Sequence, residues 1–260
     1  MRRGVWHGDR VWTVEELLEL AQEFVALEGI PLPVLWSIAQ VREGDWRELH
    51  PSELGRCLRA RALSWGLPFV QKVGPSWAPL VGRALHAYLA EAAQELFDPE
   101  EVLIEQRLSF SFPVLGEELV LTGQVDLYHR PSRTILDYKT TGSLNPRKGL
   151  PWEYELQQNL YAEILRRNGE DPARSLLWLV ETRARRPKGR GLELRSQLLE
   201  VPLWPPEAVQ AVLEELGRVV VLAHRDGILP PPFRPEDEGF WQCQFCPLLE
   251  RCRELEREGK

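Results

Sequence analysis

The sequence lacks a long run of apolar residues. No stretch of its 260 residues approaches the 18 or so uninterrupted apolar residues that a transmembrane helix needs. The first residues, Met1 to Asp9, include basic side chains but no apolar core, so they do not resemble a secretory signal peptide. Internal repeats and low-complexity tracts are also missing. These absences predict a cytoplasmic protein with no membrane partner.

An excess of positive charge is missing as well. With 32 Lys and Arg against 39 Asp and Glu, the formal net charge is −7, so any attraction to a phosphate backbone must be local. Arginines cluster around Cys57 at positions 56, 59 and 61. A second basic run, in a loop-like stretch, comprises Arg183, Arg185, Arg186, Lys188 and Arg190. Each cluster is either a solvated surface or a local contact for nucleic acid.

The pattern of apolar residues and turns predicts a mixed α/β core. Three strand-like segments, at residues 101–112, 118–128 and 134–140, follow a helix at 79–96. A helix at 153–167 and a strand at 176–183 come next, followed by a strand at 192–201 and a helix at 206–225. The order α-β-β-β-α-β indicates a small mixed central sheet flanked by helices.

Residues 1–50 are expected to form an N-terminal helical extension, and residues 51–260 the main domain. Within the extension, Thr13 to Glu16 has the form of a capping box, and a second short helix is expected at residues 33–46. In the main domain, a helix from Pro51 is expected to carry Cys57. The helix at 79–96 is expected to bury Leu85, Leu89, Ala92 and Leu96.

Two acidic residues are candidates for binding a metal ion. Asp137 and Lys139 are two residues apart on a predicted strand, so their side chains point to the same face. Asp126 lies near the end of the preceding strand, which a short turn makes an antiparallel neighbour. The two carboxylates can therefore converge on a divalent cation, which would activate water for attack on a phosphate. Taken alone, an Asp-x-Lys pattern is more often a surface ion pair.

Polar residues on the neighbouring helices could complete this site. His86 could add a nitrogen ligand, although a lone histidine beside an apolar face is more often structural. Gln157 and Tyr161 are four residues apart on one helix face and could orient a DNA backbone and support Lys139. The alternative is a half-buried tyrosine beside a solvated glutamine. Glu105 is a further carboxylate on the first strand, and we expect it to be structural.

The chain has only four cysteines. Cys243, Cys246 and Cys252 form a C-x2-C-x5-C cluster, and Cys57 is remote from them. In a reducing compartment such thiols favour metal ligation over disulfides. Three clustered thiolates with a distant fourth favour a [4Fe–4S] cluster over zinc, which more typically uses two CxxC pairs. Free buried cysteines are the third interpretation.

Together these residues resemble the RecB-like branch of the PD-(D/E)XK nuclease superfamily. The resemblance is to its iron–sulfur members, the CRISPR-associated Cas-four exonucleases and the AddB nuclease domain, and it covers about residues 50–255. The matching segments are Pro51-Ser52-Glu53-Leu54 before Cys57, Gly82 with His86, Gly123-Gln124-Val125-Asp126, Ile135-Leu136-Asp137-Tyr138-Lys139-Thr140, Gln157-x-x-x-Tyr161, and the C-terminal cysteines. The resemblance implies a restriction-endonuclease-like core with an iron–sulfur-stapled C-terminal segment.

The resemblance also assigns roles to these residues. It implies that His86, Asp126 and Asp137 bind Mg2+ or Mn2+, with the Tyr138 carbonyl as a further ligand. Lys139 would be the catalytic lysine, and Gln157 and Tyr161 would assist with substrate. The cluster ligands would be Cys57, Cys243, Cys246 and Cys252.

The activity implied is exonucleolytic cleavage of single-stranded DNA in the 5′ to 3′ direction. It would serve CRISPR adaptation beside an integrase, or phage or host recombination and repair beside recombination proteins. The alternative is a catalytically idle iron–sulfur module that binds DNA or acts as an adaptor. Since the two aspartates and the lysine are all present, the enzyme is the favoured interpretation.

Overall fold

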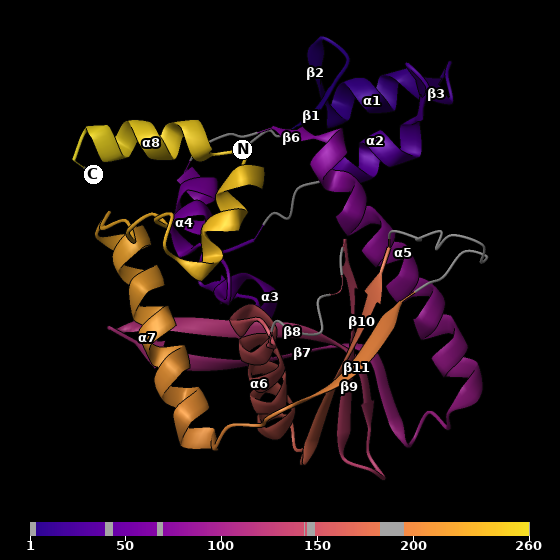
Figure 1. The fold of residues 1–260 in the computed structure, drawn as a ribbon, viewed down its shortest axis with the longest axis vertical. Helices are drawn as coiled ribbons and strands as arrows, with labels where there is room; N and C mark the ends of the chain where they lie inside the picture. Colours follow the sequence, from indigo (N-terminus) through magenta and orange to yellow (C-terminus); the bar gives the residue numbers. More distant parts are fainter. Residues whose placement is uncertain are drawn as a thin grey trace. The chain divides into compact units, whose positions relative to one another are not determined.

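The computed structural model describes residues 4–39, 44–66, 70–142, 144, 149–182 and 195–259 (Figure 1). The chain divides into two units, each made of segments that are distant in sequence. We call Arg47–Arg56 with Val81–Val221 the sheet unit, and Met1–Trp46, Cys57–Leu80 and Leu222–Lys260 the cysteine unit. Among the described residues, no helix is both long enough and apolar enough to cross a bilayer.

The sheet unit is built on a six-stranded mixed sheet. Its strands run in the order β11-β10-β9-β8-β5, with β7 also paired to β8. The strand bounds are β5 Glu48–Leu49, β7 Val102–Val114, β8 Glu117–His129, β9 Thr134–Thr141, β10 Arg174–Glu181 and β11 Ser196–Val201. Strand β9 pairs antiparallel with β8 and parallel with β10, which confirms the predicted mixed sheet.

Helices cover both faces of strand β9. Helix α6 (Trp152–Arg167) packs Tyr154 against Leu177 and Leu179, which pair with Asp137 and Lys139. Helix α5 (Val73–Leu96) approaches the other face, where a Cβ on Gly82 would lie 3.2 Å from Thr140 Oγ1. Successive strand residues point to opposite faces, so α5 and α6 flank β9 on different sides (Figure 1).

Two more helices belong wholly or partly to the sheet unit. They are α3 (Pro51–Leu54) and α7 (Pro206–Arg225). Helix α7 rests on the β7–β8 hairpin through Gly217, where an added Cβ would lie 3.0 Å from Leu119. The predicted bounds 206–225 are those observed for α7.

The cysteine unit has its own small sheet and several short helices. Its elements are β1 Gly4–His7, β2 Arg10–Thr13, α1 Val14–Leu20, β3 Ala26–Leu27, β4 Ile30–Pro31, α2 Leu32–Ala39, α4 Leu58–Gly66, β6 Gln71–Lys72, the 3-10 helix η1 Glu238–Phe245 and α8 Leu249–Arg257. The Thr13 capping box is present, because Thr13 Oγ1 accepts from the Glu16 N–H and Glu16 accepts from the Thr13 N–H. The strands among residues 1–50 were not predicted.

The structure corrects two details of the predicted helices. The helix expected from Pro51 breaks after Leu54, and Cys57 lies in the gap before α4. The Cys57 N–H donates to Gln242 Oε1 (3.2 Å) rather than continuing a helical ladder. On α5, Ala92 and Leu96 are exposed, because the helix instead buries its small residues Ala90 and Ala93.

Close contact between β8 and α6 depends on Gly123. A Cβ at this position would lie 2.7 Å from Ile164 Cδ1 and 2.9 Å from Tyr161 Cε1. We expect Gly123→Ala to lower the free energy of unfolding by about 1–3 kcal/mol through overpacking. Urea denaturation measures this, with Gly149→Ala as the control, since a Cβ at Gly149 meets nothing within 4 Å. Equal stabilities for the two variants would contradict the close packing.

Candidate functional site

Strands β8 and β9 bring two aspartates together. Leu127 pairs with Leu136, and the next position beyond this pair holds Asp126 opposite Asp137, where the ladder ends. Asp126 Oδ2 instead accepts a hydrogen bond from the Tyr138 N–H (2.8 Å). The side chains are nearly inaccessible, with 6% of Asp126 and 1% of Asp137 exposed. The two acids thus lie close together where the two strands stop pairing, near enough for the charge of Asp126 to raise the pKa of Asp137.

Lys139 lies against the deeper of these acids. Its Nζ is 2.5 Å from Asp137 Oδ2. The pKa of Asp137 is raised to about 6, mainly by burial, with Lys139 opposing this rise and Asp126 adding to it. Burial alone would lower the pKa of Lys139, but Asp137 and Asp126 outweigh it and raise the pKa above its ordinary value. The lysine is therefore an ammonium group.

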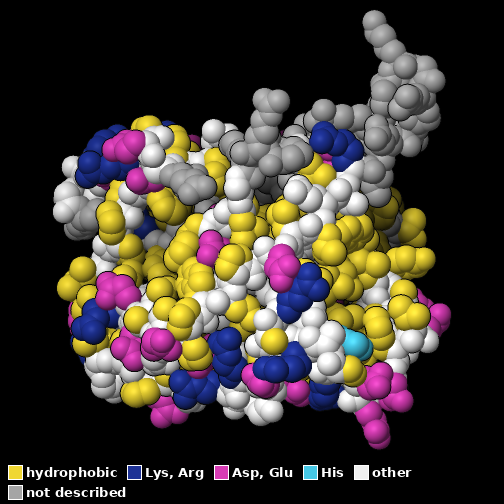
Figure 2. Space-filling model, turned by 60° about the horizontal axis from the view of Figure 1, so that its bottom comes forward, with side chains coloured by type: hydrophobic (Ala, Val, Ile, Leu, Met, Phe, Trp, Pro, Cys, Tyr) yellow, Lys and Arg dark blue, Asp and Glu magenta, His cyan; other side chains and the backbone are white. Residues whose placement is uncertain are grey.

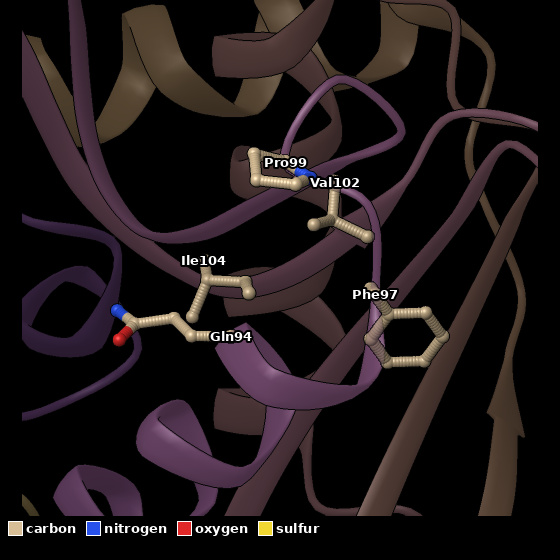
Figure 3. Close-up of a pocket in the computed structure, with 5 residues that line it drawn as sticks. All are labelled: Gln94, Phe97, Pro99, Val102 and Ile104. Atoms are coloured by element: carbon tan, nitrogen blue, oxygen red, sulfur yellow. The ribbon is translucent and has the colours of Figure 1, made fainter.

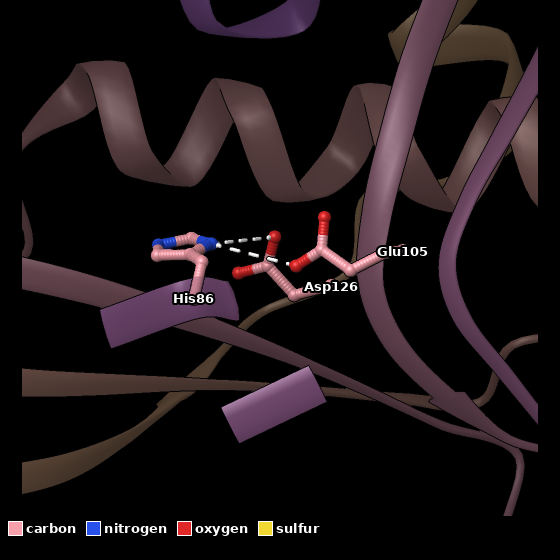
Figure 4. A group of neighbouring side chains, drawn as sticks. All are labelled: His86, Glu105 and Asp126. Atoms are coloured by element: carbon pink, nitrogen blue, oxygen red, sulfur yellow. Dashed lines mark ion pairs between the residues drawn. The ribbon is translucent and has the colours of Figure 1, made fainter. Parts of the chain in front are cut away.

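His86 and Glu105 complete a cluster around Asp126 (Figure 4). His86 Nδ1 lies 3.2 Å from Asp126 Oδ1 and 3.8 Å from Glu105 Oε1. One ligand atom from each of the three residues lies within 4.8 Å of the other two. Hydrogen bonds to Asp126 and Glu105 raise the pKa of His86 to about 10. His86 is therefore protonated when no metal is bound, and a metal ion bound between these carboxylates would take the place of its Nδ1 proton.

Glu105 was expected to be structural, yet its carboxylate faces the cluster. In β7, Ile104 pairs with Leu127 and Gln106 with Val125, but the intervening pair of Glu105 and Asp126 is missing from the ladder. At this point Glu105 has φ of 49°, a strained conformation for a non-glycine residue. Its Oε2 accepts from Gln124 Nε2 at 2.5 Å. Only the pairing of β7 with β8, which places Glu105 opposite Asp126, indicates this role, and no residue pattern in the sequence does so.

Gln157 and Tyr161 face the sheet from α6 and bind each other. Gln157 Nε2 donates to Tyr161 Oη (3.0 Å), and both side chains are buried. Burial holds the pKa of Tyr161 well above its ordinary value, so its phenol is neutral. Tyr154 was not predicted as a site residue, although it is close enough to Lys139 for the ammonium to lower the pKa of its phenol, which burial raises.

The donor set suits a hard divalent cation. Asp137 Oδ1 is buried, and within the described part of the chain no hydrogen-bond donor reaches it. Leaving a buried carboxylate oxygen unpaired is costly, and a cation would relieve that cost. Carboxylate oxygens joined by an imidazole nitrogen are ligands that Mg2+ and Mn2+ accept. The structure brings His86, Glu105 and Asp126 close enough to hold such an ion, with Asp137 beside them.

The four cysteines gather in the cysteine unit. Cys57 lies between α3 and α4, Cys243 and Cys246 lie in and after η1, and Cys252 lies in α8. Burial is the main cause that raises the pKa of the Cys243 thiol, and the other three cysteines raise it further. Those three cysteines are therefore close enough to Cys243 to interact with it electrostatically. No three of their Sγ atoms, all in the described part of the chain, lie within 4.8 Å of one another.

Of the three arginines near Cys57, Arg56 is exposed and the other two are buried. Arg59 and Arg61 are only 2% and 8% exposed. Arg59 donates to the Pro230 carbonyl (2.8 Å) and Arg61 to the Trp46 carbonyl (3.0 Å), both inside the cysteine unit. The second basic run, Arg183 to Arg190, lies outside the described residues. On the face drawn in Figure 2, Lys and Arg are interspersed with Asp and Glu.

A small pocket elsewhere in the sheet unit carries no ionisable group (Figure 3). It lies where α5 ends and β7 begins, and one amide and four apolar side chains line it. These are Gln94, Phe97, Pro99, Val102 and Ile104. The pocket offers no chemistry comparable to that of the acidic cluster.

Comparison with known proteins gives a family for this arrangement. The model of the PD-(D/E)XK nuclease superfamily matches residues 35–253. The crystal structure of SSO0001 has a TM-score of 0.53 at 16% identity, covering 92% of this chain and 93% of that one, which shows a shared fold alone. A Eubacterium rectale protein provisionally described as an exonuclease has a TM-score of 0.37 at 15% identity, covering 64% of this chain and 73% of that one, too low to carry an argument. No curated protein matches the chain.

The position of Glu105 leads to a test by metal binding. We expect Glu105→Gln to weaken Mn2+ binding by about 10-fold, because the cluster loses a negative ligand next to Asp126. Isothermal titration calorimetry without DNA measures the dissociation constant. Glu95→Gln is the matched control, since Glu95 is exposed on α5. An unchanged constant for Glu105→Gln would make Glu105 a structural residue.

Proposed function

The chain belongs to the PD-(D/E)XK nuclease superfamily, and from that premise we propose that it is a Mg2+- or Mn2+-dependent deoxyribonuclease. We propose further that it is an exonuclease that degrades single-stranded DNA in the 5′ to 3′ direction. One observation carries the proposal. His86, Asp126, Asp137 and Lys139 converge at the opening between β8 and β9, and a buried carboxylate oxygen of Asp137 has no hydrogen-bond donor among the described residues.

Each residue of the cluster has a distinct role in this proposal. His86, Asp126 and Asp137 would hold the ion, with Glu105 and the Tyr138 carbonyl as further donors. The ion would supply charge neutralisation at the scissile phosphate and a more acidic water. Asp137 holds the Lys139 ammonium at the cluster's edge, where it can donate hydrogen bonds to a phosphate oxygen as negative charge develops. Gln157 and Tyr161 would support this region from α6.

The cysteine unit would hold a [4Fe–4S] cluster on Cys57, Cys243, Cys246 and Cys252. Four thiols within electrostatic reach of one another are a fitting donor set. Three cysteines clustered in the sequence with a distant fourth favour a cluster over zinc, which more typically uses two CxxC pairs. The cluster would staple the C-terminal segment to the region of Cys57.

The biological setting is proposed from the resemblance to the Cas-four and AddB proteins. In that setting the protein acts in the cytoplasm, on single-stranded DNA. It serves CRISPR adaptation with an integrase, or phage or host recombination and repair with recombination proteins. The competing function is an idle iron–sulfur module that binds DNA without cutting it. An idle module would be expected to have lost one of the two aspartates or the lysine. Asp126, Asp137 and Lys139 are all present, which favours the enzyme.

A degradation assay separates the enzyme from the idle module. Single-stranded DNA labelled at its 5′ or 3′ end is incubated with Mn2+ and wild-type protein, and we expect mononucleotides or short products from the 5′ end. Asp137→Asn and Lys139→Met should each lower the rate by about 100-fold or more, since each removes charge at the reacting phosphate. Glu95→Gln is expected to cut like the wild type.

The outcomes of this assay are distinct. Circular single strands that survive while linear strands disappear establish exonuclease action, and the labelled end that is lost first gives the polarity. Bound but intact DNA in every sample, with Mn2+ present, would leave the idle DNA-binding module as the function.

The cysteine assignment has its own test by metal analysis. Protein purified without oxygen is expected to be brown and to contain iron and sulfide. Cys57→Ser should lose most of the iron and lower the melting temperature, because metal ligation contributes to folding. Asp137→Asn is the control and should keep its iron while losing cleavage. If wild-type protein is colourless and contains one zinc per chain, the four cysteines bind zinc and not an iron–sulfur cluster.

A further inference from the structure

His86 reaches the acidic cluster from a thinly buried helix. In the part of α5 that belongs to the sheet unit, Ala90 and Ala93 are the buried hydrophobic residues, while Tyr88 and Leu96 are 69% and 75% exposed. The His86 side chain itself is 26% exposed. Deep burial therefore does not fix its rotamer, and the imidazole needs local contacts to keep Nδ1 directed at Asp126.

Tyr138 makes such a contact. Its ring lies perpendicular to the His86 ring, with centroids 6.0 Å apart and planes at 86°. A perpendicular pair sets the positive edge of one ring against the negative face of the other. The backbone N–H of the same residue donates to Asp126 Oδ2 (2.8 Å). One residue thus contacts two members of the cluster through separate groups.

Trp178 supports the Tyr138 ring from the neighbouring strand. The two residues are paired in the parallel register of β9 and β10, so their side chains lie on the same face. Their rings are also perpendicular, with centroids 6.2 Å apart and planes at 89°. His86, Tyr138 and Trp178 therefore form a row of edge-packed rings that starts at the acidic cluster and rests on the sheet.

We propose that the side chain of Tyr138 is a positioning residue that orients the imidazole of His86 for metal binding. This inference rests on the proposed function, because it concerns the same metal site. It differs from a ligand role of the Tyr138 carbonyl, which every side-chain variant retains. The ring alone carries the effect, and the phenolic oxygen is dispensable.

The test is a double-mutant cycle read out as the dissociation constant for Mn2+ without DNA. Tyr138→Phe keeps the ring and should bind Mn2+ within about 2-fold of the wild type. Tyr138→Leu removes the ring and should weaken binding by about 10-fold, the effect expected when a partner that orients a ligand is lost. In a His86→Ala background, Tyr138→Leu should change the constant by less than about 2-fold, because no imidazole remains to be oriented.

Controls separate orientation from damage to the fold. Phe110→Leu removes a ring from the same sheet that pairs with Phe112 rather than with His86, and it should leave Mn2+ binding unchanged. Tyr138→Met, which fills more of the space of the ring, replaces Tyr138→Leu if the latter fails to fold, and the same loss is expected. Melting temperatures are measured for each variant.

Two results overturn the inference. Wild-type binding in Tyr138→Leu does so, and so does an equal loss with and without His86. In either case wild-type protein still binds Mn2+, and the proposed nuclease stands. A wild-type protein that binds no Mn2+ overturns the metal site of the proposed function and this inference together.

Discussion

The structure of the site depends on the burial of Asp137 beside Asp126. Two carboxylates withdrawn from water in one place are unfavourable unless positive charge accompanies them. When no metal is bound, Lys139 beside Asp137 and protonated His86 beside Asp126 supply that charge, and the pKa of Asp137 still rises to about 6 through burial. The buried acids therefore need a cation, and a metal ion bound here would take the place of the proton on His86. A surface ion pair, which an Asp-x-Lys pattern more often forms, would not create this need.

The pairing of β8 with β9 ends next to the two acids, and this helps to hold them in place. Beyond the Leu127–Leu136 pair, Asp126 takes the Tyr138 N–H that a partner strand would otherwise use. On the other edge of β8, the strained backbone at Glu105 interrupts the pairing with β7 at the same level. Because of these two interruptions, Asp126 has no partner residue in either strand ladder. The carboxylates of Asp126 and Glu105 both lie near His86. The glycine at position 123 lets Tyr161 and Ile164 of α6 pack closely against β8.

Most of the sheet unit could be predicted, because its determinants are local in the sequence. Alternating residues and the tight turn before Thr134 bring Asp126, Asp137 and Lys139 together on neighbouring strands. Glu105 could not be assigned, since its role depends on a register and a positive φ that no residue type announces. The strand β1 was missed for a similar reason. It pairs in parallel with β6, as Val5 with Gln71, across a sequence separation that local patterns do not report.

The cysteine unit depends on long-range closure to a greater degree than the sheet unit does. Three separate chain segments form it, and Cys57 is hydrogen-bonded to Gln242, 185 residues away. Closing so long a loop costs chain entropy, which the hydrogen bond of Arg59 to Pro230 and the packing of Leu63 with Leu248 and Leu255 also help to offset. A cluster ligated by Cys57 and the three C-terminal cysteines would make this closure with four strong bonds. The only thiols in the chain occupy these positions, so under the proposed function they would join the segments. Metal bound at the acids would then serve catalysis, and metal bound at the thiols would serve assembly.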